Sequence, residues 1–111
     1  MKPSKQFLAI LSIGCLVSAP AAFANCGLPS APSKIPDGAT ASMQVMVTAM
    51  HTVKEYNHDV ETYLKCLDFE ARQNQLSSGS VVNLHNAAVE RLQRVTAKFN
   101  KQVRIFKSRH S

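Results

Sequence analysis

Cysteine offers the widest chemistry in this chain, and its three cysteines lie in two different settings. Cys15 lies inside an apolar N-terminal run, whereas Cys26 and Cys66 belong to the part of the chain that follows. Positions 1–24, which include Cys15, have the parts of a signal peptide, as described below. Two cysteines in a small exported chain most often form one disulfide. We therefore predict a Cys26–Cys66 bond within one chain, with unpaired or intermolecular cysteines as the alternative.

Three potential metal ligands, His51, Glu55 and His58, are spaced so that they lie on one side of a predicted helix. A metal ion could bridge adjacent members, but the two histidines would lie about 10 Å apart along the helix axis, too far for one ion to take all three easily. The zinc-binding pattern His-Glu-x-x-His is absent. We predict a solvated helix face here, with no cofactor.

Methionines form a second candidate metal site, because thioethers suit Cu(I). Met43, Met46 and Met50 recur at spacings of three and four residues along the same predicted helix. Methionine at such positions is an ordinary packing residue, and we predict packing here as well. A periplasmic chaperone or metal-stress protein that uses the methionine and histidine rows is the alternative function.

Four basic residues, Arg91, Arg94, Lys98 and Lys101, form one ribbon along a predicted helix, because they are spaced three, four and three residues apart. As a functional surface, this basic ribbon would attract an anionic envelope surface or an acidic protein. As a plain solvated face, it would be partly neutralised by acids of the preceding helix. Nucleic acid fits the charge equally well, but an exported protein rarely meets it and no aromatic residues interleave to stack bases. We predict no nucleic-acid partner.

Catalytic motifs are absent from the sequence. It contains no nucleophile elbow and no Gly-rich phosphate loop, and its carboxylates are scattered along open helix surface instead of being walled in a cleft. With 111 residues and a net charge of +6, the chain holds one small domain at most. We therefore predict a protein that is not an enzyme and that acts through protein or envelope-surface contacts.

Positions 1–24 have the parts of a secretory signal peptide. Lys2 and Lys5 precede an uncharged apolar run over 7–17, and residues 22–24 form a small-x-small cleavage site. The apolar run is too short for a transmembrane helix, which needs about 20 residues, and no later segment comes close. We predict cleavage after Ala24 and a periplasmic or secreted protein. A lipoprotein anchored through Cys15, in the lipobox-like Ser12-Ile13-Gly14-Cys15, is the alternative.

Prolines and glycines divide the remaining chain into an arm and a helical hairpin. Segment 25–38 contains all three later prolines, so we predict an extended, polyproline-like arm. Beyond it the sequence has no proline and a single glycine, Gly79, which predicts helices over about 39–76 and 80–107. The predicted fold is all-α, a two-helix antiparallel hairpin in 39–111 with the Pro-rich arm stapled to the first helix by the disulfide.

Apolar residues recur at spacings of three and four in both predicted helices, which predicts a heptad seam in each. Asn57, His85 and Gln102 are polar members of these seams. Tyr56 and Tyr63 fall beside the first seam, where we predict that they shield the core and stack with basic residues. The seams comprise Met43, Met46, Met50, Val53, Asn57, Val60, Leu64, Leu67 and Ala71, then Val81, His85, Ala88, Leu92, Val95, Phe99, Gln102 and Phe106.

Charge is distributed unequally along the hairpin. Segment 25–70 carries three bases and six acids, whereas 71–111 carries eight bases and one acid. Opposite signs favour antiparallel pairing, with Asp68 near Arg91 and Glu61 near Arg94 to Lys98, although each exposed pair contributes only about 0.5 kcal/mol.

A second apolar row, Val82, Val89 and Val103, runs beside the seam of the second helix. The resulting stripe is wider than one partner helix can cover. The first predicted helix is also the longer one, so its N-terminal end would project beyond the second. We predict a homo-oligomer that uses these valines together with the projecting Met43 and Met46.

Several short motifs resemble those of a group of short exported proteins from Gram-negative bacteria. This resemblance covers nearly the whole chain after the signal peptide, and it implies export and a helical hairpin without implying an activity. The Leu-Thr-x-x-Gln motif of small helical periplasmic stress chaperones is absent. The motifs are Cys26-Gly-Leu-Pro, Ile35-Pro36-Asp37-Gly38, Tyr63-Leu64-Lys65-Cys66, His85-Asn86-Ala87-Ala88-Val89 and Phe99-Asn100-Lys101-Gln102-Val103-Arg104.

Overall fold

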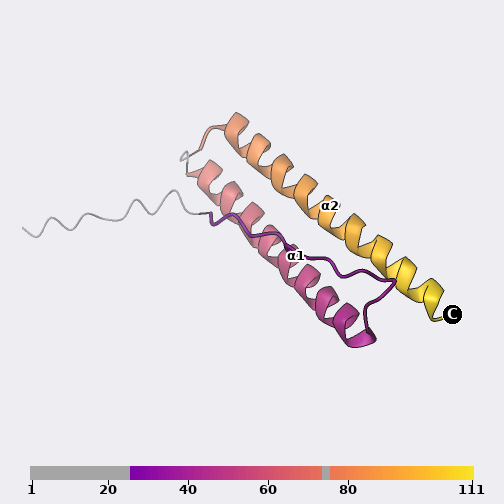
Figure 1. Ribbon diagram of the computed structural model, residues 1–111. Coiled ribbons are helices and arrows are strands. Elements are labelled where there is room, and N and C mark those ends of the chain that lie inside the picture. The colour runs from indigo at the N-terminus through magenta and orange to yellow at the C-terminus, as the bar shows by residue number, and fades with distance from the viewer. Residues whose placement is uncertain (1–25, 74–75) are drawn as a thin grey trace, which may run out of the picture.

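The computed structural model describes residues 26–73 and 76–111 and confirms the predicted fold class. Two helices, α1 (Met43–Arg72) and α2 (Ser78–Arg109), pack against each other as a hairpin, and the preceding segment is extended (Figure 1). No strand occurs among these residues. The predicted signal peptide, its cleavage site and Cys15 lie outside the described residues.

Helix α1 begins at Met43, four residues later than the sequence predicts. Asp37 caps a separate turn instead, because its carboxylate accepts the Ala39 N–H at 2.9 Å and its carbonyl accepts the Ala41 N–H at 2.9 Å. Ser42 is the actual helix cap, with extended backbone and a hydroxyl that accepts the Val45 N–H at 3.2 Å. The arm therefore extends through this turn and ends at residue 42.

The boundaries of both helices next to the connection lie earlier in the chain than predicted. Helix α1 ends at Arg72 instead of residue 76, and Ser77 caps α2 by accepting the Ser80 N–H at 3.2 Å. Ser78 and Gly79, which lie between the two predicted helices, therefore belong to the first turn of α2. With 30 and 32 residues the helices are nearly equal in length, so the predicted overhang of α1 is wrong.

The core side of α1 differs from the predicted seam by one row. Its buried residues include Met46, Val53, Val60 and Leu67, as predicted, but the alternating positions are Tyr56, Tyr63 and Glu70. Asn57 is exposed and donates a hydrogen bond to Glu61 at 3.2 Å. The two tyrosines are thus core residues, only 4% and 5% exposed, which leaves them buried instead of shielding the core from beside it.

The core side of α2 agrees with its predicted seam. Ala88, Val95, Phe99 and Phe106 are buried, while Val81 and Leu92 are partly buried and pack against them. His85 is the exception, because its side chain is exposed. Among the described residues, the one cation–π pair joins Arg109 to the Phe106 ring and does not involve a tyrosine.

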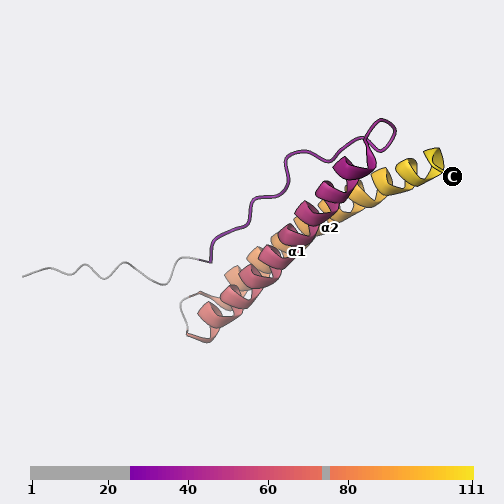
Figure 2. The same ribbon diagram turned by 90° about the horizontal axis from the view of Figure 1, so that it is seen from below.

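The arm lies on one side of the helix pair, which we call the arm face (Figure 2). At its start, Cys26 and Cys66 form the predicted disulfide, with Cα atoms 5.4 Å apart. Closing the loop between residues 40 positions apart contributes about 4 kcal/mol in the chain-entropy account of disulfides. From there the arm crosses toward the C-terminal half of α2 and returns to the start of α1 (Figure 1).

Candidate functional site

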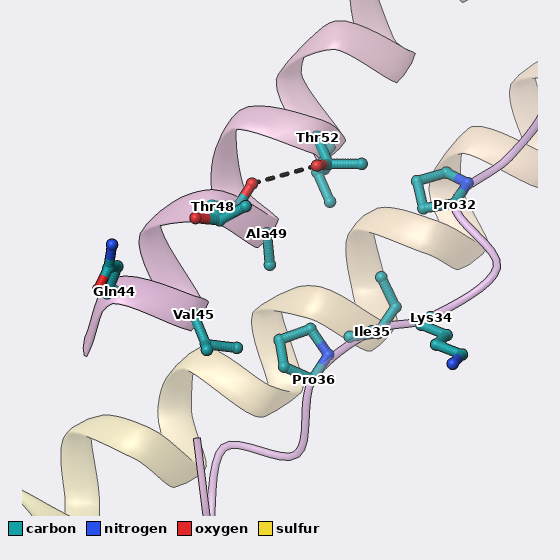
Figure 3. A pocket seen from close by; sticks show the side chains of 10 residues that line it. Pro32, Lys34, Ile35, Pro36, Gln44, Val45, Thr48, Ala49 and Thr52 are labelled. Carbon is teal, nitrogen blue, oxygen red and sulfur yellow. Dashed lines mark hydrogen bonds between the residues drawn. The ribbon is translucent and has the colours of Figure 1, made fainter. Parts of the chain in front are cut away.

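An apolar slot lies between the arm and the first turns of α1. Its cavity volume is about 590 Å³, within the range of small-molecule pockets. Ile35 and Pro36 of the arm lie across from Val45 and Ala49 of α1, as Figure 3 shows. The complete lining is Pro32, Lys34, Ile35, Pro36, Gln44, Val45, Thr48, Ala49, Thr52 and Val53.

The slot is an open space because one of its walls is the extended, proline-containing arm and the other is the surface of α1. Proline fixes an extended backbone, so the arm cannot coil down onto α1. Below it, α1 presents a small alanine and two threonines, and the Thr52 hydroxyl donates to the Thr48 carbonyl of its own helix at 3.1 Å (Figure 3). The Thr52 hydroxyl is thus satisfied within its own helix, and Val45, Ala49 and Val53 give this side of the slot its apolar surface.

Two lysines of the basic ribbon lie beside the slot. Lys98 and Lys101 of α2 line a neighbouring pocket of about 300 Å³ together with Asp37. This pocket shares Ile35 and Pro36 with the slot. The arm thereby brings an apolar cavity next to ammonium groups on a different helix, an arrangement that sequence spacing within α2 alone does not reveal.

The basic ribbon is exposed along its whole length, since Arg91, Arg94, Lys98 and Lys101 are all exposed. Arg94 forms an ion pair within α2, with its Nη1 atom 3.8 Å from Oε2 of Glu90. The predicted pairing with acids of α1 is wrong in the described part of the chain, where the other ion pair, Arg72–Asp68, also lies within one helix. Most of the ribbon's charge is therefore free to attract an external anion.

The end of the arm is fixed to α2 by hydrogen bonds and close packing. The Gly38 N–H donates to Gln102 Oε1 at 2.9 Å, so this polar seam residue holds the arm. A Cβ on Gly38 would overlap the Gln102 carbonyl and come within 3.0 Å of the Phe106 nitrogen. Arg109 donates to the carbonyl oxygens of Ala39 and Ala41. The arm is thus held at its end by α2 and at its start by the disulfide.

A second cluster surrounds the disulfide. The Sγ atoms of Cys26 and Cys66 and a carboxylate oxygen of Glu70 all lie within 4.8 Å of one another. Glu70 is only 7% exposed, and its Oε2 has no hydrogen-bond partner. Sequence analysis missed Glu70, although its place four residues after Cys66 puts both on the same side of a helix.

The three candidate metal ligands from the sequence do not form one close group in the described part of the chain, although Glu55 and His58 line the same pocket. His51, Glu55 and His58 are all exposed on α1. Within the described residues, the close group of three potential ligands is Cys26, Cys66 and Glu70 at the disulfide. Among the methionines, Met46 is buried in the core while Met43 is 62% exposed. The methionine row is therefore divided between the core and the exposed surface of α1.

Among the described residues, neither helix combines the length and the apolar character needed to cross a membrane. In comparisons with protein-family models, curated proteins and solved structures, no match to this chain was found. The arm face and the disulfide cluster are therefore the features of the molecule that bear on its function.

Proposed function

We propose that this protein is a non-enzymatic, exported protein that attaches to anionic lipid surfaces through its arm face. The observation that carries the proposal is that the apolar slot adjoins the pocket lined by Lys98 and Lys101. The two cavities have Ile35 and Pro36 of the arm in common. An anionic lipid has the matching pair of features, an acyl chain next to a negative headgroup.

Electrostatics supply the first part of the attraction. A basic residue near an anionic membrane surface contributes about 1 kcal/mol, and the effect falls off within a Debye length. The four exposed members of the basic ribbon lie along one edge of α2, and Lys34 of the arm lines the slot. Together they would hold the arm face against lipid phosphates.

Apolar contact supplies the second part. Val45 is 47% exposed and faces the slot, so an acyl chain that enters would remove it and the proline rings from water. Burial of apolar surface contributes roughly 25 cal/mol per Å². Export itself is supported by the signal-peptide pattern of positions 1–24, and the non-enzymatic character by the lack of catalytic motifs in the sequence.

Co-sedimentation with vesicles tests this function. The protein lacking residues 1–24 should pellet with phosphatidylglycerol vesicles at low salt, and high salt should release it, because the Debye length shrinks from about 10 Å at 0.1 M to about 3 Å at 1 M. A variant with Arg91, Arg94, Lys98 and Lys101 all changed to Gln should stay in the supernatant. If the wild type stays there too, or if the variant pellets equally well, the proposal is wrong.

A matched pair of valine variants tests the slot separately. Val45→Asp places a charge in the slot, whereas Val47→Asp places one on an α1 position that does not line it; the two valines are 47% and 40% exposed. We expect Val45→Asp to weaken vesicle binding several-fold more than Val47→Asp. Equal effects would show that attachment uses charge without the slot.

A further inference from the structure

One oxygen of the Glu70 carboxylate is unusual because it is buried without a hydrogen-bond partner. Its residue is 7% exposed, and the Oε2 atom is inaccessible and unpaired. Leaving a buried acceptor unsatisfied costs about 1–3 kcal/mol, and more for a charged group. Buried polar atoms in native proteins are nearly always satisfied, so this position calls for a partner that binds in another state of the protein.

The nearest groups with complementary chemistry are the two sulfur atoms of the staple. Cys66 and Glu70 are one helical turn apart on α1, and the arm brings Cys26 to the same place. One ligand atom from each of the three residues lies within 4.8 Å of the others. Two thiolates and a carboxylate are zinc ligands.

The geometry needs only small movements to hold an ion. With Zn–S bonds of about 2.3 Å and Zn–O bonds of about 2.0–2.2 Å, tetrahedral ligand atoms lie roughly 3.5–3.8 Å apart. The carboxylate oxygen, which lies within 4.8 Å of both sulfurs, would approach them by no more than about 1.3 Å, and the two sulfurs would move apart from their bonded distance. Helix α1 fixes two of the three ligands, and the arm supplies the freedom for the third.

An entry route lies beside the cluster. A pocket of about 360 Å³ is lined by both cysteines, Gly27, Pro29, Asp59, Thr62 and Tyr63. Both cysteines are half-buried and line this pocket, whereas Glu70 does not line it. The pocket has room for an approaching ion and for a water molecule as fourth ligand, as in open zinc sites with three protein ligands.

We propose that the dithiol form of this protein binds one Zn²⁺ through Cys26, Cys66 and Glu70, so that the staple is a redox-controlled metal site. A dithiol reductant supplies two electrons and two protons, which convert the disulfide into two thiols while the reductant becomes a disulfide. Zn²⁺ then displaces both thiol protons to solvent, and Glu70 binds through its carboxylate. The disulfide excludes the metal, and the metal closes the same loop as the disulfide.

Metal titration of the chain lacking residues 1–24 tests the site. After reduction with a phosphine, which leaves no competing thiol, the protein should bind one Zn²⁺ per chain by calorimetry and show a thiolate-to-Co²⁺ charge-transfer band with Co²⁺. The oxidised protein should do neither. Zn²⁺ should also restore most of the thermal stability lost on reduction, because it closes the same loop.

Glutamate variants distinguish the proposed ligand from its surroundings. Glu70→Gln should lower the Zn²⁺ affinity of the reduced protein at least about 10-fold, a loss that even outer-shell partners of metals produce. Glu61→Gln, on the exposed side of α1, is the control and should have no effect. Circular dichroism verifies that both variants keep their helices.

Three results would overturn this metal site. They are equal zinc affinity of Glu70→Gln and wild type, binding by the oxidised protein, and affinity of the reduced wild type no greater than that of a variant with both cysteines changed to Ser. None of these results bears on vesicle binding, which uses other residues.

Discussion

Single positions decide whether the arm can lie on the hairpin, and Gly38 is the clearest of them. The backbone of this residue touches the backbone of α2 with no room for a side chain. In the sequence this position belongs to the predicted extended arm, and no local pattern requires glycine there. The requirement for glycine arises from a helix 64 positions away, and local sequence carries no signal of such an approach.

Substitution of Gly38 should therefore destabilise the protein. Gly38→Ala forces a methyl group into the Gln102 carbonyl, and such overpacking costs about 1–3 kcal/mol. We expect the melting temperature to fall by roughly 4–8 °C per kcal/mol. Gly27→Ala is the matched control, because an added Cβ there meets no atom within 4 Å. Equal melting temperatures for both variants would mean that the arm does not pack on α2 in solution.

Glu70 shows a second limit of sequence reasoning at the scale of the residue. In the sequence it is one of several acids on a helix, and nothing marks it as buried. One of its near neighbours is Cys26, with ligand atoms within 4.8 Å, and this cysteine comes from a segment more than forty positions earlier. The disulfide itself was predictable because only two cysteines follow the predicted cleavage site.

At the scale of the element, the helices were predictable and the register of α1 was not. Two apolar rows flank the positions of Met46, Val53, Val60 and Leu67: one continues through Met50 and Leu64, the other through tyrosines. The more aliphatic row gives the better heptad pattern. The tyrosine row is the buried one, because the arm covers the edge that carries Cys66 and adds contact area which a two-helix pattern does not include.

Truncation of neighbouring residues tests this register. Tyr56→Ala should cost about 3–5 kcal/mol, as removal of a large buried aromatic side chain does, whereas Asn57→Ala should change stability by no more than about 0.5 kcal/mol, as for an exposed position. Chemical denaturation of the two variants gives both values. A larger loss for Asn57→Ala would restore the register that the sequence favours.

At the scale of the whole molecule, the arm makes the two faces of the hairpin unequal. Ala88 is buried, and its neighbours Ala87 and Val89 lie about 100° to either side of it on α2. Lys101 borders the arm and has the same heptad position as Ala87. The valine row 82, 89 and 103 therefore lies on the back face, which the arm leaves uncovered (Figure 2).

This back face should mediate self-association, with a second copy as the partner. Val82 is 55% exposed and Met43 is 62% exposed, while Met46, which the sequence placed in this surface, is buried in the core and takes no part. Burying such a stripe removes apolar area from water, and contiguous exposed apolar patches are rare on monomers.

Sedimentation equilibrium at rising concentration should show a dimer of the wild type. A variant with Val82 and Val89 changed to Lys should remain monomeric, whereas Ala87→Lys, on the arm side of α2, should still dimerise. A wild type that stays monomeric at the highest concentration would show that the back face needs no second copy.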